Sequence, residues 1–165
     1  MPLKHPIPIG SPMRPDLRFA LKRFEALSLQ ELYDVLYLRN VVFVVGQKIT
    51  SEPEVDGLDP RCSHAMLYAG DELVGTARVF DEESPMVIGR VAVHTERQRE
   101  GLGTILMERI QDELGDTACE LHAQAHLEEW YSRLGWKRVG EVFDEAGIPH
   151  VMMVRGDVGT ARNSC

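Results

Sequence analysis

The sequence predicts a single α/β (α+β) domain built on a mixed sheet with helices packed against it. Roughly seven short apolar segments are separated by turn residues, and segments with helical spacing interrupt them. The chain has 165 residues, of which 44% are hydrophobic and 27% charged, and this suits one globular domain with a buried core. We place the domain at residues 17–155, between a flexible lead-in at 1–16 and a disordered tail at 156–165.

The first half of the domain is expected to contain a strand, a helix and a meander. Residues 17–27 read as the first strand. Ser28 then opens a helix with Glu31 three residues later, the spacing of a capping box. A β-branched run at 41–45 follows, and the segment 52–60 is rich in Pro, Gly and Asp, which predicts a loop. Short turns then connect three strands as an antiparallel meander, at 64–69, 73–80 and 87–93.

The second half alternates strands and helices. Residues 101–114 carry apolar side chains at helical spacing, and a shorter helix is expected at 127–134. The strand at 118–123 follows the first of these helices. It can therefore lie parallel to the strand at 87–93 through a right-handed crossover. The last two strands are placed at 136–142 and 148–154.

The composition argues against a polyanionic partner. Eighteen basic against 26 acidic residues give a formal net charge of -8, which repels a nucleic-acid backbone or an anionic membrane. Arg90, Arg97 and Arg99 cluster in the sequence, but three arginines would hold a small anion at most. No apolar run is long enough for a transmembrane helix. Three irregularly spaced cysteines argue against a disulfide framework and favour a cytoplasmic location.

The most informative segment is the loop that leads from the strand at 87–93 into the next helix. Gly101 and Gly103 let the backbone approach a ligand and orient several N–H groups alike. A helix start of this kind binds an anion such as a pyrophosphate. Leu106 replaces the third glycine of a dinucleotide fingerprint, and the lysine of a P-loop is absent. From the residues alone, a purely structural tight turn stays open as the alternative.

Five stretches resemble the GNAT acetyltransferase superfamily. Gln98-Arg99-Glu100-Gly101-Leu102-Gly103 matches its Q/R-x-x-G-x-G/A signature, and residues 130–136 are similar to its aromatic-Tyr-x-x-x-Gly-Phe segment. Three more, at 38–47, 54–59 and 140–150, resemble its ElaA-like branch. The resemblance implies a mostly antiparallel, roughly seven-stranded sheet flanked by about four helices. It also implies transfer of an acetyl group from acetyl-CoA to a small-molecule or peptide amine, with a non-catalytic acyl-CoA sensor as the alternative.

The resemblance further implies which residues hold the coenzyme. The backbone of Val91, Ala92 and Val93 would lie along the pantetheine, with the Val93 amide directed at the thioester carbonyl. The Glu100 side chain should point outward, because a carboxylate is unfavourable beside an anion. The pyrophosphate would lie on the loop and helix start formed by Gln98, Arg99, Glu100, Gly101, Leu102, Gly103 and Thr104.

Tyr131 matches the general acid of the family. A phenol with a pKa of about 10 can donate a proton to the departing thiolate and recover it; a packed aromatic residue at a helix end is the alternative. The general base stays open among four residues near strand ends. Glu141 and His150 are taken as catalytic candidates, and His122 and Asp144 as candidates for substrate binding. Cys119, on an expected central strand, is interpreted as buried and inert.

The resemblance implies that the loop at 52–60, called the acidic loop below, borders the acceptor pocket. Its carboxylates Glu54 and Asp56 would recognise a cationic amine, and a solvated or cap-forming loop is the alternative. No metal is expected, because His122 and His126 lack the adjacent Glu of a zinc motif and begin on a strand. A homodimer is the assembly that the family commonly forms.

Overall fold

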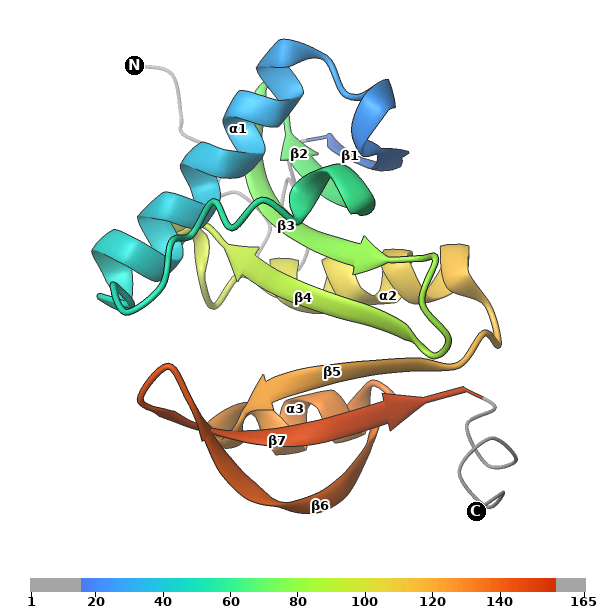
Figure 1. The fold of residues 1–165 in the computed structure, drawn as a ribbon. Helices are drawn as coiled ribbons and strands as arrows, with labels where there is room; N and C mark the ends of the chain where they lie inside the picture. The colour runs from blue at the N-terminus through green and yellow to red at the C-terminus, as the bar shows by residue number, and fades with distance from the viewer. Residues whose placement is uncertain (1–15, 157–165) are drawn as a thin grey trace, which may run out of the picture.

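The computed structural model describes residues 16–156, and its centre is a seven-stranded sheet in the order β1-β2-β3-β4-β5-β7-β6 (Figure 1). Apart from Asp16 and Gly156, the expected lead-in and tail lie outside the described residues. The strands are β1 (Leu17–Arg23), β2 (Ser63–Ala69), β3 (Glu72–Phe80), β4 (Met86–Val93), β5 (Cys119–Gln124), β6 (Lys137–Glu145) and β7 (Ile148–Arg155).

All neighbouring strands but one pair are antiparallel, which confirms the mixed, mostly antiparallel sheet. β4 and β5 run parallel, as predicted, and the helix α2 (Leu102–Leu114) connects them. Their pairing is short, because it joins only Met86–Ile88 of β4 to Cys119–Leu121 of β5. Beyond these residues, β4 and β5 do not pair with each other.

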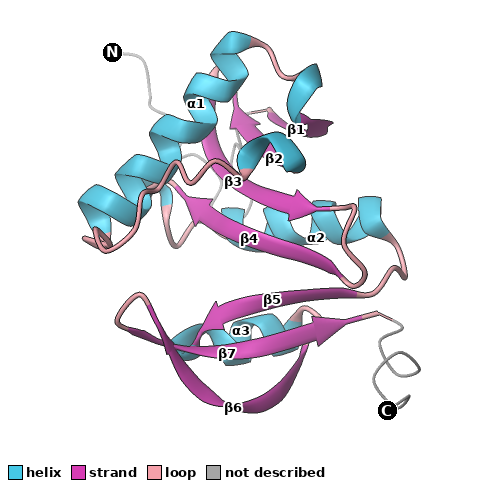
Figure 2. Cartoon of the chain, viewed as in Figure 1, coloured by secondary structure: helices cyan, strands magenta, loops and turns pink. Residues whose placement is uncertain are grey.

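Three α-helices flank the sheet within residues 16–156: α1 (Leu29–Arg39), α2 and α3 (Glu128–Arg133) (Figure 2). The expected number of about four is therefore too high. The β-branched run contributes a π-helical segment, Asn40–Gly46, that continues α1. Its backbone bonds reach five residues back, as from the Gln47 N–H to the Val42 carbonyl at 2.9 Å. None of the described helices is long and apolar enough to cross a membrane.

The start of α1 confirms the predicted capping box. The Glu31 N–H donates to Ser28 Oγ at 3.0 Å, and the Ser28 N–H donates to Glu31 Oε1 at 2.9 Å. Each residue thus satisfies a backbone donor that the helix leaves unpaired. α1 then runs directly into the π-helical segment, and the acidic loop at 52–60 follows.

Two strand ends differ from the prediction by more than one residue. β1 stops at Arg23, because the next three residues turn into a 3-10 helix and the Phe24 N–H donates to the Cys62 carbonyl. β6 does not end at residue 142 but continues to Glu145. Ala146 and Gly147 both have positive φ, 54° and 77°, and close a two-residue hairpin turn into β7.

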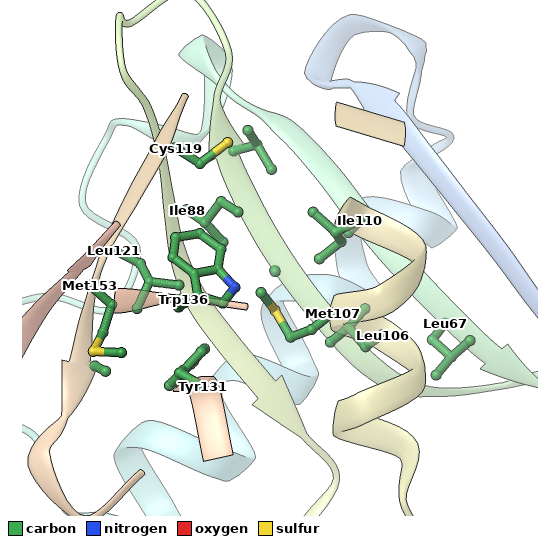
Figure 3. Close-up of a cluster of buried hydrophobic side chains, with 14 of the residues drawn as sticks. Leu67, Ile88, Leu106, Met107, Ile110, Cys119, Leu121, Tyr131, Trp136 and Met153 are labelled. Carbon is green, nitrogen blue, oxygen red and sulfur yellow. The ribbon is translucent and has the colours of Figure 1, made fainter. Parts of the chain in front are cut away.

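Hydrophobic side chains cover both faces of the sheet. α1 packs on one face and α2 and α3 on the other (Figure 1). Along β2 the side chains alternate, so that Leu67 belongs to the core under α2 and α3 while Met66 and Tyr68 pack towards α1. Figure 3 shows the core under α2 and α3, which contains Tyr131 and Cys119. Cys119 is 1% exposed, as predicted.

Candidate active site

A cavity of about 720 Å³ lies where β4 and β5 separate. The two strands are paired as far as Ile88 and Leu121 and then move apart towards their carboxyl ends (Figure 1). Side chains from β5, β7 and α3 close the cavity opposite the edge of β4. The cavity lining includes nine of the ten predicted coenzyme-binding residues: Val91, Ala92, Val93, Gln98, Arg99, Gly101, Leu102, Gly103 and Thr104.

The edge of β4 that faces this cavity carries backbone groups that pair with no strand in the described part of the chain. Between its pairings with Thr76 and Arg78 of β3, β4 holds one extra residue, and Arg90 adopts a φ of 51°. Such a β-bulge bends the strand and re-aims the groups that follow it. Beyond Ile88, no described strand bonds β4 on the β5 side, so N–H and C=O groups there are available to an extended ligand.

The start of α2 directs further backbone amides at the cavity. Gly101 is the N-cap residue and has a left-handed φ of 76° that glycine adopts at little cost. The Ile105 N–H bonds the Gly101 carbonyl at 3.2 Å, so the amides before Ile105 have no partner inside the helix. Those of Leu102, Gly103 and Thr104, together with the helix dipole, favour an anion at this position.

The loop before α2 is tied to the end of β4. Gln98 Nε2 donates to the Val93 carbonyl at 3.2 Å. Arg97 and Arg99 both line the cavity and add positive charge to it. Glu100 is exposed and does not line the cavity, and its Oε2 accepts from Arg97 Nε at 2.7 Å. Its side chain therefore points away from the cavity.

Tyr131 is a buried phenol in the cavity wall. It is 4% exposed and packs edge-on against Trp130 and Trp136, at centroid distances of 4.7 and 6.3 Å. Burial raises the pKa of the phenol, so the hydroxyl stays protonated at neutral pH. Its hydroxyl makes no hydrogen bond with any residue that the structure describes. The side chain is thus both a packed aromatic and an uncommitted proton donor.

Three arginines neutralise three carboxylates of the acidic loop, Glu54, Asp56 and Asp59. The ion pairs join Arg39 to Glu54 and Asp59 (2.8 and 2.6 Å), Arg78 to Asp56 and Asp59 (2.7 and 3.0 Å), and Arg90 to Glu54 (3.0 Å). Glu54 lines the cavity and Asp56 does not. Because both carboxylates are already paired, these contacts favour the structural alternative for the loop over recognition of a cationic acceptor.

The four candidates for the base fall into two groups. His122 and His150 line the cavity, from β5 and β7 respectively. Glu141 is exposed on β6 and lies outside the cavity lining. Asp144 also lies outside it, and its Oδ1 accepts from the Gly147 N–H at 3.1 Å in the hairpin turn. The structure therefore brings the two histidines together at the cavity and leaves the two carboxylates aside.

Glu145 is a cavity residue that the sequence analysis missed. Its carboxylate lies 2.8 Å from His122 Nδ1 and 3.5 Å from His150 Nε2. It was overlooked because β6 was expected to end at residue 142. The signal was present in the period-two alternation, which puts Phe143 and Glu145 on the same face of the strand. Within residues 16–156, no three His, Cys, Asp or Glu side chains are close enough to hold a metal ion.

The parallel pair β4 and β5 opens onto the amide-rich start of α2, an arrangement suited to an extended ligand that carries an anionic group. The model of the acetyltransferase (GNAT) domain family matches residues 49–155, and the chain belongs to that family. The Escherichia coli protein ElaA is 38% identical over 138 residues, covering 78% of this chain and 90% of ElaA. This similarity confirms the ElaA-like branch.

Solved structures agree with the assignment. An acyl-CoA N-acyltransferase from Pseudomonas aeruginosa superposes with a TM-score of 0.77 at 40% identity, covering 86% of this chain and 100% of that one. The crystal structure of Escherichia coli ElaA gives a TM-score of 0.77 at 35% identity, covering 85% and 99%. The fold, the family and its general chemistry of acyl transfer therefore apply to this chain.

Proposed function

We propose that the protein transfers an acetyl group from acetyl-CoA to an amine by direct attack of the amine on the thioester. The observation that carries this proposal is the convergence of two backbone sites on one cavity. The free edge of β4 and the unpaired amides of α2 both line it. The 40% identical Pseudomonas aeruginosa relative, an acyl-CoA N-acyltransferase, supports acyl-CoA as the donor.

The coenzyme would be held mainly by main-chain groups. The pantetheine amides are suited to pair with the bulged edge of β4 at residues 91–93, in the manner of an added strand. The pyrophosphate would bind the amides of residues 101–104, with Arg97 and Arg99 adding charge. Gln98 and Glu100 contribute by fixing the loop through Val93 and Arg97. No carboxylate side chain of this loop enters the anion site.

The chemical step needs an oxyanion donor and a proton for the leaving group. We assign the first role to the Val93 amide at the end of the free edge. The second falls to the Tyr131 hydroxyl, which is buried and protonated and makes no hydrogen bond within residues 16–156. Positioning the two reactants in the enclosed cavity supplies much of the remaining rate.

The acceptor would enter on the side of the cavity lined by β5 and β7. An amine with a pKa of about 10.4 arrives mostly as ammonium and must lose a proton before it can attack. His150 and His122 are the predicted residues that reach this space. Glu54 lines this space while it is paired with Arg39 and Arg90. Asp56 and Asp144 lie outside the lining, where Asp56 pairs with Arg78 and Asp144 accepts a hydrogen bond in the β6–β7 turn.

The test is calorimetric titration of the purified protein with acetyl-CoA, with NADH and ATP as control nucleotides. Selective binding of acetyl-CoA is expected, followed by release of free coenzyme A thiol when primary amines are added. Binding without thiol release would instead indicate a non-catalytic acyl-CoA sensor. Absence of binding to acetyl-CoA and to longer acyl-CoAs would refute the proposal, because the turn at 98–104 would then be structural only.

A further inference from the structure

Glu145 is held between two histidines at the acceptor side of the cavity. The carboxylate Oε1 lies 2.8 Å from His122 Nδ1 on β5, and Oε2 lies 3.5 Å from His150 Nε2 on β7. His150 is 7% exposed, whereas the His122 side chain is 43% exposed. One carboxylate therefore links a buried imidazole to one that reaches solvent.

The arrangement depends on the hairpin that joins β6 to β7. The register pairs Glu145 with Ile148 and Phe143 with His150, so Glu145 and Phe143 lie on one face two residues apart. The Phe143 ring contacts both imidazoles, edge-on to His122 at 5.0 Å and stacked on His150 at 6.1 Å. This packing fixes both rings and limits the positions open to the carboxylate.

The hydrogen bonds define which imidazole nitrogens carry protons. His150 Nδ1 lies 2.7 Å from the Ile148 carbonyl, which can only accept, so Nδ1 is the donor and Nε2 faces Glu145. His122 Nδ1 in turn donates to the Glu145 carboxylate at 2.8 Å.

We propose that Glu145 is the general base that removes a proton from the acceptor, a primary amine that arrives as an ammonium ion. This inference rests on the proposed acetyl transfer. Glu145 is the catalytic residue, because it contacts the reacting nitrogen. His122 is a positioning residue, because its Nδ1–H donates to the carboxylate at 2.8 Å, and His150 contacts the same carboxylate at 3.5 Å.

The proton balance follows from the overall reaction, in which an ammonium ion and acetyl-CoA give an amide, coenzyme A thiol and one proton. The first ammonium proton passes to Glu145 and from its half-exposed carboxyl group to water, and the freed lone pair forms the C–N bond. When the C–S bond breaks, the thiolate takes the Tyr131 hydroxyl proton. The second nitrogen proton also passes through Glu145 to water, and Tyr131 recovers its proton from solvent, so that one proton is released in all.

The charges around the cavity favour Glu145 over other carboxylates. Glu54 is paired with two arginines, and Glu141 lies outside the lining. Glu52 lines the cavity from the opposite loop and makes no ion pair within the described residues, so it adds attraction for a cation without sharing the histidines. The charged or titratable groups that line the cavity with Glu145 are Glu52, Glu54, Arg78, Arg90, Arg97, Arg99, His122, His126, Tyr131 and His150.

The test compares full-length Glu145→Gln with Glu141→Gln and with the surface control Glu108→Gln on α2. Acetyl-CoA affinity is measured by calorimetry, and thiol release is followed with the primary amines cadaverine, spermidine and lysine. Glu145→Gln should lower kcat at least about 100-fold at unchanged acetyl-CoA affinity, the usual scale for loss of a general base. Glu108→Gln should match the wild type, and Glu141→Gln should stay within about threefold of it.

The pH profile separates catalysis from a structural role. In Glu145→Gln, kcat/KM should rise about tenfold per pH unit below the pKa of the amine, because only the free amine can react. The wild type should show a plateau in the same range, and Glu145→Asp should regain part of the lost rate.

Three results would overturn the inference. A Glu145→Gln variant with full turnover excludes the role, and so does a loss of equal size in Glu141→Gln. A slow Glu145→Gln variant with the wild-type pH profile would make Glu145 structural. If the wild type binds acetyl-CoA but acetylates none of the amines, the result contradicts the proposed acetyl transfer itself. It differs from the three results above, in which the wild type is active and only the role of Glu145 is refuted.

Discussion

The indole of Trp130 lies directly against the Cα atom of Gly103. A Cβ atom at position 103 would meet Trp130 Cζ2 at 3.4 Å and Val93 Cγ2 at 3.5 Å. Trp130 Nε1 also donates to Thr104 Oγ1 at 3.0 Å. The first turn of α2 is therefore fixed between β4 and α3, and its amides face the cavity in a defined direction.

Replacing Gly103 by Glu should abolish acetyl-CoA binding. The side chain would push against the indole and bring a carboxylate to the proposed pyrophosphate site, where it repels the phosphates. Gly103→Ala adds only the Cβ atom at ordinary contact distance, so this variant should keep the fold and most of the affinity. Calorimetry with acetyl-CoA checks both variants, and circular dichroism confirms that each is folded. Equal affinity in a folded Gly103→Glu variant would place the pyrophosphate elsewhere.

Tyr131→Phe should lower kcat by about 10- to 100-fold while the affinity for acetyl-CoA changes little. The ring packs against two tryptophans and keeps those contacts in the variant, whereas the proton donor is lost. The measurement is thiol release at saturating acetyl-CoA, with binding determined separately. An unchanged rate combined with weaker binding would show that the hydroxyl serves the ground-state complex and not the departing sulfur.

Arg39→Leu should destabilise the protein by about 3 kcal/mol, because it leaves buried carboxylates short of a partner. The expected loss of unfolding free energy is at the low end of the range for such pairs, because Asp59 stays paired with Arg78 and Glu54 with Arg90. Urea unfolding measures the change. Arg133→Leu, which removes an exposed ion pair on α3, is the control and should have a much smaller effect.

Acid should destabilise the folded state through the same cluster. Hydrogen bonds from Arg78 hold the pKa of Asp56 below its ordinary value of 3.8, and although burial opposes the shift at Asp59, its arginine partners also lower that pKa. The stabilisation that these two carboxylates contribute is therefore fully present above about pH 4. It is lost as the pH falls from there through their lower folded-state pKa values. Urea unfolding between about pH 6 and pH 3 should show this loss, and Asp56→Asn should show less of it. Parallel curves for both proteins would contradict the assignment.

Several features of the fold and site were predictable from the sequence, because their signals are local. The Ser28 and Glu31 spacing defines the start of α1, and the glycines at 101 and 103 define an amide-rich helix start after a strand. Each depends on backbone conformations and hydrogen bonds within one or two turns of chain. Tyr131, which the aromatic motif singled out, lines the cavity.

The acceptor side was decided only by the tertiary structure. Glu54 and Asp56 looked like free carboxylates in the sequence, but arginines from α1, β3 and β4 reach them from up to 36 positions away. Glu145 became a cavity residue because two positive φ angles extend β6 and bring it beside His122, 23 positions earlier. Local chain chemistry determines caps, turns and anion-binding helix starts, whereas the pairing of distant charges depends on how strands register, and no local pattern records that.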